Sequence, residues 1–465
     1  MGKISIKLLQ AVFTVDLLAF ASGNFYSWSS TALIKLKNTD PGKNPLGRPV
    51  TYSEESLIAS LLSLGAICGP LLAGICANAL GRKNTILLFS LPMLASSLIL
   101  TFATTTFEFY LARLMAGVGV GGVYTVVPMY IGEIAETNVR GFLGGVMGIF
   151  NVLGMLLGFA VGPFVDLKMF CFLQVIPTGL FLILWNSYVP ESPFYHLIKE
   201  DEFAARRSLT YLRKSFDEKE MEMMRDTVNK STSEHSLCVM FSSQGFRRAL
   251  ILTTLIMALQ QLMGSIAILS YMEDIFAASG SSLSASTSTI IVALLQVCLV
   301  VLSTFLADRW GRKLLLMISV ATCALSLFPL GLYFFIKYNE YDVSQLWFLP
   351  ILCIVLFFVG FNFGLCTIPW TLVGELFTTE AKATASSITS ITYFGMAFLM
   401  SFVFPHLKNF IGFHGVFWFC GSFSLAHLVF IYFFLPETKG KTFQEILDLM
   451  EKDKRSECFV NINRI

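Results

Sequence analysis

The sequence predicts an all-α integral membrane protein whose twelve transmembrane helices form two six-helix bundles related by pseudo-two-fold symmetry. Of its 465 residues, 55% are hydrophobic and 14% are charged, well below the ~25% charged residues of soluble domains. Three charged motifs each occur twice in the same order: Gly81-Arg82-Lys83 with Gly311-Arg312-Lys313, Gly132-Glu133-Ile134 with Gly374-Glu375-Leu376, and Pro190-Glu191-Ser192 with Pro436-Glu437-Thr438. Two related halves with charged clusters at matching helix ends are typical of a two-bundle transporter.

The apolar runs are long enough for helices that cross a bilayer. A transmembrane helix needs about 20 mostly apolar residues, whereas barrel strands alternate and are about half as long. Hydropathy predicts helices at 8–30, 55–77, 84–106, 109–131, 142–163, 170–189, 247–275, 285–307, 314–337, 347–374, 383–405 and 413–435.

Charge placement predicts the orientation and the division of the chain. Basic residues gather on the side that carries both termini, so the positive-inside rule makes that side cytoplasmic. The exception is the first opposite loop, which holds Lys35, Lys37, Lys43 and Arg48. We predict an N-terminal bundle at 1–190, a cytoplasmic linker with short amphipathic helices at 191–246, a C-terminal bundle at 247–437 and a cytoplasmic tail at 438–465.

The sequence contains no motif typical of a metal site, an ATP site or nucleic-acid binding. The ten cysteines and five histidines show no spacing typical of a metal site, and most cysteines lie in or beside apolar helices. The glycines of 117–122 follow no strand and precede no Walker lysine, so they predict no ATP site. The mixed charges of the linker argue against nucleic-acid binding. We therefore expect no enzyme activity, catalytic residue, metal or other cofactor.

A set of short motifs carries a family resemblance. In chain order these are Gly81-Arg82-Lys83, Arg113 with Gly117, Gly119 and Gly121, Glu133 with Arg140-Gly141, Pro190-Glu191-Ser192-Pro193, Gln260-Gln261-Leu262, Asp308-Arg309-Trp310-Gly311-Arg312-Lys313, Pro369-Trp370, Gly374-Glu375-Leu376-Phe377 and Pro436-Glu437-Thr438-Lys439-Gly440. Over nearly its whole length the chain resembles the sugar porters of the major facilitator superfamily. Within that family it most resembles the insect facilitated trehalose transporters and their hexose-carrying relatives.

The resemblance implies that a neutral sugar such as trehalose or a hexose crosses the membrane by alternating access. Proton-coupled relatives place an aspartate after a glycine–aromatic pair in the first helix, and the matching stretch Gly23-Asn24-Phe25 has none. This difference favours facilitated uniport. Asp16 in the same helix keeps proton symport open as the alternative, because an intramembrane acid is a candidate functional site. A sugar sensor that binds without transporting is the other alternative.

Polar side chains on apolar helices predict the sugar site. Gln260 and Gln261 offer amide donors and acceptors that suit the hydroxyls of a neutral sugar, and Trp370 after Pro369 offers an apolar face at an expected helix break. The resemblance adds Gln296 and Asn362. The opposing interpretation is that each amide satisfies a backbone group or a neighbouring helix. Three usual polar sugar contacts are replaced here, by Gly148, Ile266 and Tyr393.

The repeated charges predict a cytoplasmic gate. Ionised side chains near the bilayer are costly without partners, and acids and bases here gather on the same side. The resemblance implies a gate built from Arg82, Arg113, Glu133, Arg140, Glu191, Asp308, Arg312, Glu375, Lys382 and Glu437. The simpler alternative is that these charges only anchor helix ends. We further expect a monomer in the plasma membrane, crossing the lipid bilayer many times.

Overall fold

The computed structural model describes residues 5–40, 44–136, 139–213, 218–231, 244–306, 311–377 and 379–439. Within these residues the chain is helical and contains no strand, as the composition predicts. The first half comprises α1 (Ile6–Leu36), α2 (Tyr52–Leu80), α3 (Arg82–Phe102), α4 (Thr106–Ile134), α5 (Arg140–Val161), the short η1 (Gly162–Phe164), α6 (Leu167–Leu173) and α7 (Val175–Tyr188).

Among the described residues, three short helices follow the first half, and the second half then repeats the pattern. The short helices are α8 (Pro193–Ile198), α9 (Glu202–Leu212) and α10 (Glu218–Ser231). The second half comprises α12 (Gln244–Leu262), α13 (Ser265–Ser270), α14 (Met272–Ser279), α15 (Ala285–Leu306), α16 (Arg312–Tyr338), η2 (Ser344–Leu346), α17 (Leu349–Gly360), η3 (Phe361–Leu365), α18 (Ile368–Leu376) and α19 (Thr379–Phe434).

The number of membrane crossings follows from helix length. Eleven helical runs among the described residues are long and apolar enough to cross a bilayer. One of them, α19, has 56 residues and would be about 84 Å long if straight, far more than the ~30 Å of a hydrocarbon core. Gly412 breaks it with a φ of 70°, so α19 holds two crossings. The fold therefore has the twelve predicted transmembrane helices.

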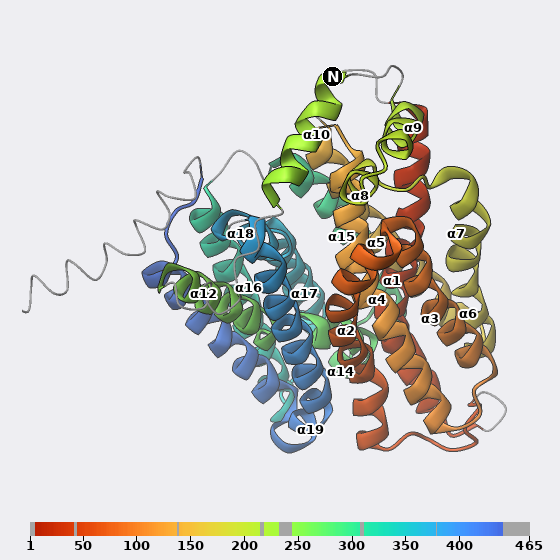
Figure 1. The fold of residues 1–465 in the computed structure, drawn as a ribbon. Coiled ribbons are helices and arrows are strands. Elements are labelled where there is room, and N and C mark those ends of the chain that lie inside the picture. Colours follow the sequence, from red (N-terminus) through yellow and green to blue (C-terminus); the bar gives the residue numbers. More distant parts are fainter. Residues whose placement is uncertain are drawn as a thin grey trace, which may run out of the picture.

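The two halves stand side by side, with red and orange helices in one and green to blue helices in the other (Figure 1). They meet where α2 packs against α19 and where α5 packs against α15, and α1 also contacts α13 and α14. We call the side where α1 begins and α8–α10 lie the terminal face, at the top of Figure 1. The opposite side, where α1 ends and α2 begins, is the far face.

Glycines allow the closest helix crossings within the first half. A Cβ atom on Gly117 of α4 would lie 2.1 Å from the Leu62 carbonyl oxygen of α2. A Cβ on Gly154 of α5 would lie 1.9 Å from the Phe20 carbonyl oxygen of α1. Both distances are impossible for real atoms, so these backbones touch only because the side chains are absent. At these two positions glycine is thus a packing requirement, whereas Gly141 and Gly144 at the start of α5 face open space.

Two transmembrane helices of the second half are broken. The seventh crossing, predicted as one helix at 247–275, is divided because Gly264 adopts a left-handed conformation (φ 84°) between α12 and α13. The tenth crossing contains a π-helical turn, η3, followed by an irregular turn before α18. Its break begins ahead of Pro369, where the sequence predicted one. Both breaks lie about halfway along their crossings, at the depth expected for a transported substrate.

Candidate functional site

The two broken helices are held together by polar side chains. Gln260 of α12 donates from Nε2 to the carbonyl oxygen of Leu365 in η3, at 2.9 Å. Ser319 of α16 accepts from the backbone N–H of Leu365 and donates to the carbonyl oxygen of Gly360. Asn362 donates from Nδ2 to the carbonyl oxygen of Phe358, at 2.9 Å. Gln260 therefore satisfies the Leu365 carbonyl, four residues before Pro369, which has no N–H to offer it, and the Asn362 amide bonds within its own helix.

Other amide atoms at this depth have no protein partner among the described residues. These are Oε1 of Gln260, Nε2 of Gln261 and Nε2 of Gln296, all on buried side chains. Gln261 uses its Oε1 to accept from the hydroxyl of Ser265, at 3.3 Å. A buried amide atom without a partner is costly, so such atoms call for a ligand or water. The arrangement offers one acceptor and two donors.

Aromatic residues from both halves lie near Gln261. The indole of Trp370 packs edge-on against Tyr393 of α19, with ring centroids 5.2 Å apart. Tyr393 lies next to Gln261, and it is within electrostatic range of Tyr26 of α1 and Tyr124 of α4. Tyr393 is therefore a polar aromatic at a position where the sequence predicted a lost contact.

The sequence reasoning missed three residues of the first half: Tyr26, Tyr124 and Asn151. Tyr124 lies against Asn151 of α5, and Asn151 donates from Nδ2 to the carbonyl oxygen of Ala19, at 3.3 Å. The sequence did contain one signal for Asn151, because it is a side-chain amide in the otherwise apolar predicted helix 142–163. Asn151 lies three residues after Gly148, which is nearly one helical turn, so both face a similar direction. Gly148 itself faces Val300 of the other half.

Charged residues cluster where the first half reaches the terminal face. Arg82 at the start of α3 forms a salt bridge with Glu133 at the end of α4, with Nη2 and Oε1 2.8 Å apart. Glu191 accepts from the backbone N–H groups of Arg82 and Lys83 at the N-terminus of α3, where the helix dipole favours an anion. Ser192 donates to Glu133. Burial raises the pKa of Glu191 more than these hydrogen bonds lower it.

The second half repeats this cluster residue by residue. Arg312 bridges Glu375 at 3.1 Å, Glu437 accepts from the N–H groups of Arg312 and Lys313, and Thr438 donates to Glu375 at 2.7 Å. Burial raises the pKa of Glu437, but the backbone hydrogen bonds outweigh it and hold the value below its usual range. Among the described residues, the hydrogen bonds and salt bridges of all four carboxylates lie within the half that supplies the carboxylate.

Arg113 does not lie with the gate residues, so its placement there was wrong. It is fully buried in α4, twenty residues or about 30 Å of helix before Glu133, toward the far face. It donates to the carbonyl oxygens of Phe25 (2.8 Å) and Ile58 (3.0 Å) and to the hydroxyl of Ser29 (2.6 Å). Arg113 thus ties α1, α2 and α4 together.

The remaining gate residues fall into two groups. Arg140 is exposed at the start of α5, and no salt bridge to it is found among the described residues. Asp308 lies outside the described residues, as does the side chain of Lys382 in α19. The predicted salt bridges of these three residues therefore stay predictions.

Asp16 lies buried in the first half of α1. Its side chain is fully buried, and neither carboxylate oxygen has a hydrogen-bond partner among the described residues. Burying an ionised carboxylate without a partner costs far more than burying the neutral acid. The environment thus suits a protonated side chain.

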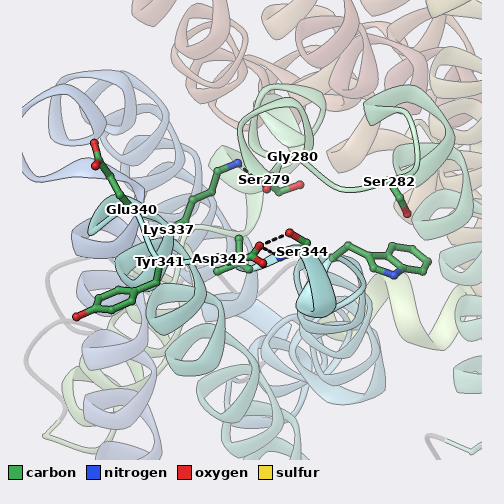
Figure 2. A pocket seen from close by; sticks show the side chains of 10 residues that line it. Ser279, Gly280, Ser282, Lys337, Glu340, Tyr341, Asp342 and Ser344 are labelled. Atoms are coloured by element: carbon green, nitrogen blue, oxygen red, sulfur yellow. Dashed lines mark hydrogen bonds between the residues drawn. The ribbon is translucent and has the colours of Figure 1, made fainter.

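A pocket of about 360 Å³ lies at the far face of the second half (Figure 2). Lys337 extends toward the end of α14 and donates to the carbonyl oxygens of Ala278 and Ser279, at 2.8 and 2.7 Å. Asp342 accepts from Ser344. Lys337 and Asp342 are therefore satisfied by protein, and the pocket lies away from the midway amides.

The fold and the midway polar site define a membrane carrier, and comparison with known proteins identifies its family. A family model described as "Sugar (and other) transporter" matches residues 18–449, so the chain belongs to that family. Its members are transporters rather than enzymes.

Curated relatives are insect proteins named facilitated trehalose transporter Tret1. Those of Drosophila pseudoobscura pseudoobscura and Bombyx mori are each 31% identical across 94% of this chain, and the match covers 50% and 86% of the relative. The chain thus spans about half the length of several curated relatives.

Solved structures resemble the whole fold. The xylose transporter XylE from E. coli in a partially occluded inward open conformation has a TM-score of 0.76 and 23% identity, covering 94% of this chain and all of that one. A proton:xylose symporter XylE structure with bound 6-bromo-6-deoxy-D-glucose has a TM-score of 0.75 and 22% identity, covering 95% of this chain and 99% of that one. At this identity the likeness concerns the fold.

Proposed function

We propose that this protein is a facilitative carrier of a neutral sugar, trehalose or a hexose, that works by alternating access. The observation that carries the proposal is the set of unpartnered amide atoms on Gln260, Gln261 and Gln296 at the depth of the two helix breaks. Donors and acceptors without a charged side chain suit sugar hydroxyls, and the Trp370–Tyr393 pair offers a surface for the C–H face of the ring. The names of the insect relatives support trehalose as a first substrate to test.

We further propose that the terminal face is cytoplasmic, that the protein resides in the plasma membrane and that it acts as a monomer without ATP or nucleic acid. The basic residues at the terminal face support this orientation. The division into bundles at 1–190 and 247–437, joined by the linker at 191–246, belongs to the same proposal. In the cycle, the sugar binds between the halves, and the salt-bridged clusters of the terminal face separate as that side opens.

Proton-coupled symport is the second candidate, and Asp16 is the observation that favours it. A buried acid without a partner is a candidate to carry a proton, and one structural neighbour is titled a proton:xylose symporter. A sensor that binds sugar without moving it remains the third.

Uptake of radiolabelled trehalose and glucose into vesicles, with and without a pH gradient, separates these candidates. Uniport gives sugar counterflow that no pH gradient drives uphill. Symport gives accumulation against the sugar gradient, which Asp16→Asn abolishes. A sensor binds sugar but shows no flux with either substrate.

The site itself is tested by Gln261→Ala, which removes an unpartnered donor. We expect uptake to be lost while the amount of protein in the membrane is unchanged. Unaltered uptake would remove Gln261 from the site. Ser422→Ala serves as a matched control, because Ser422 is an exposed polar residue on α19 whose hydroxyl bonds only its own helix.

A further inference from the structure

Four charged side chains form a continuous cluster at the far face, which we call the latch: Glu55, Lys37, Asp274 and Lys408. Lys37 Nζ lies 2.8 Å from Glu55 Oε1 and 3.1 Å from Asp274 Oδ1, and Lys408 Nζ lies 2.7 Å from Asp274 Oδ2. Negative and positive charges thus alternate in space in the order Glu55, Lys37, Asp274, Lys408.

The latch joins the two halves of the protein. Lys37 follows α1 and Glu55 lies in the first turn of α2, so both belong to the first half. Asp274 lies in α14 and Lys408 in α19, both in the second half. The Lys37–Asp274 contact therefore bridges the halves, whereas the carboxylate contacts that the described residues make at the terminal face stay within a half.

Burial makes these contacts stronger than ordinary surface pairs. The side chains of Lys37, Asp274 and Lys408 are 29%, 22% and 17% exposed, and that of Glu55 only 2%. Lys37 and Lys408 both lie within salt-bridge distance of Asp274, so its carboxylate is flanked by two positive charges. Removing one partner would leave another charge buried and uncompensated, which is the costly case for a buried ion pair.

The latch also lies on the broken seventh crossing. The backbone N–H of Glu273 in α14 donates to the hydroxyl of Ser30 in α1, at 2.9 Å, beside the Lys37–Asp274 contact. The segment α13–α14 that carries both contacts begins directly after Gly264, and Gln260 and Gln261 lie just before that glycine. Gln260 and Gln261 thus lie before the Gly264 break and Asp274 lies after it, with a second interruption at Tyr271 between α13 and α14.

We propose that the latch closes the carrier at the far face, and that its strength sets how often the empty protein opens toward that side. The proposal rests on the proposed carrier function. Opening at the far face requires Asp274 to leave Lys37 and Glu273 to leave Ser30, by movement of α13–α14 about Gly264. The ion pairs of the latch thus add to the packing of α1 against α13 and α14 in holding this face closed.

Hydrogen–deuterium exchange on the full chain in detergent or nanodiscs tests the latch without any transport measurement. In Asp274→Asn, the cross-half ion pair is lost. We expect exchange of the backbone amides of 265–280 to rise by about tenfold, the effect of about 1.4 kcal/mol, while amides of 82–90 at the terminal face stay unchanged.

The matched control is Arg48→Gln. Arg48 pairs with Glu54 at 2.5 Å on the same far face, but both residues belong to the first half. We expect this variant to exchange like the wild type. Equal exchange of 265–280 in Asp274→Asn and Arg48→Gln would overturn the proposal.

Two further variants separate opening from misfolding. Lys408→Gln keeps the Lys37–Asp274 contact between the halves. An increase in amide exchange that is confined to 265–280 and smaller than in Asp274→Asn therefore supports the proposal. The effect of Lys37→Gln combined with Asp274→Asn should fall short of the sum of the two single effects, because both remove the same cross-half contact. Faster exchange throughout the chain, or fully additive effects, would count against the latch. If the exchange pattern holds but no variant or wild type moves sugar, the latch stands and the carrier function fails.

Discussion

Substitution of Arg113 by Met tests the corrected position of this arginine. The guanidinium makes three hydrogen bonds to α1 and α2 and lies over the ring of Trp28, 5.1 Å from its centroid. No carboxylate lies within salt-bridge distance of it among the described residues. Its role is therefore to join helices of the first half, and a similarly long apolar side chain removes the bonds while preserving much of the volume.

The magnitude follows from two opposing effects. Hydrogen bonds from a charged donor are each worth about 1.5–3 kcal/mol, so three of them stabilise by roughly 5–9 kcal/mol. Burying a charge without an opposite charge costs several kcal/mol, and methionine avoids that cost. We therefore expect Arg113→Met to lower the free energy of unfolding by about 2–4 kcal/mol.

Thermal melting of the purified protein in detergent measures this loss. Arg140→Gln is the control, because Arg140 was assigned to the same gate but is exposed at the terminal face. We expect Arg113→Met to melt several degrees lower and Arg140→Gln to melt like the wild type. If Arg113→Met melts like the wild type, the three hydrogen bonds contribute nothing net, and the structural role assigned to Arg113 is refuted.

Three other predictions follow from the site and its surroundings. Gln260→Ala should lower both sugar uptake and melting temperature, because the Gln260 side chain also donates to the carbonyl oxygen of Leu365. Loss of uptake at unchanged melting temperature would show that this hydrogen bond does not stabilise the fold. Gly264→Ala should slow sugar exchange at least severalfold in counterflow assays, because a Cβ would lie 2.9 Å from the sulfur of Cys420 in a left-handed conformation; normal counterflow would show that the hinge tolerates a side chain. Melting temperature measured against pH should separate Glu191 from Glu437. The folded protein gains stability as pH falls through the raised pKa of Glu191, so Glu191→Gln should remove that gain. The folded protein loses stability as pH falls from the usual glutamate value through the lowered pKa of Glu437, so Glu437→Gln should remove that loss. Identical pH profiles for these two variants would contradict the assignment.

The helices were predictable because each crossing must satisfy its own backbone hydrogen bonds and must be about 20 apolar residues long. The break near Trp370 was predictable from Pro369, since proline lacks a backbone N–H. The break at Gly264 was not predicted, because a glycine within an apolar helix is also common as a packing residue. Its left-handed backbone is seen only in the fold.

The candidate sugar site was likewise predictable only in part. Chemistry and resemblance pointed to Gln260, Gln261 and Trp370, since amides and indoles are costly on apolar helices unless they have a partner. Sequence patterns did not show that Gln260 donates to the backbone carbonyl oxygen of Leu365. They also did not show that Tyr124 and Asn151 of the first half lie near Tyr393 of the second half. Such contacts join residues that are far apart in sequence, so no local pattern encodes them.

That the chain crosses a bilayer in two related halves could be predicted from its residues, because hydropathy and repeated motifs are local properties of the chain. The residues also predict which charges recur, and the fold forms each repeated cluster with the same partners. The position of Arg113 at a helix junction and the contact of Lys37 with Asp274 across the halves are seen only in the folded protein. Pairing of charges depends on distance in space, and a list of residues contains the charges without the distances.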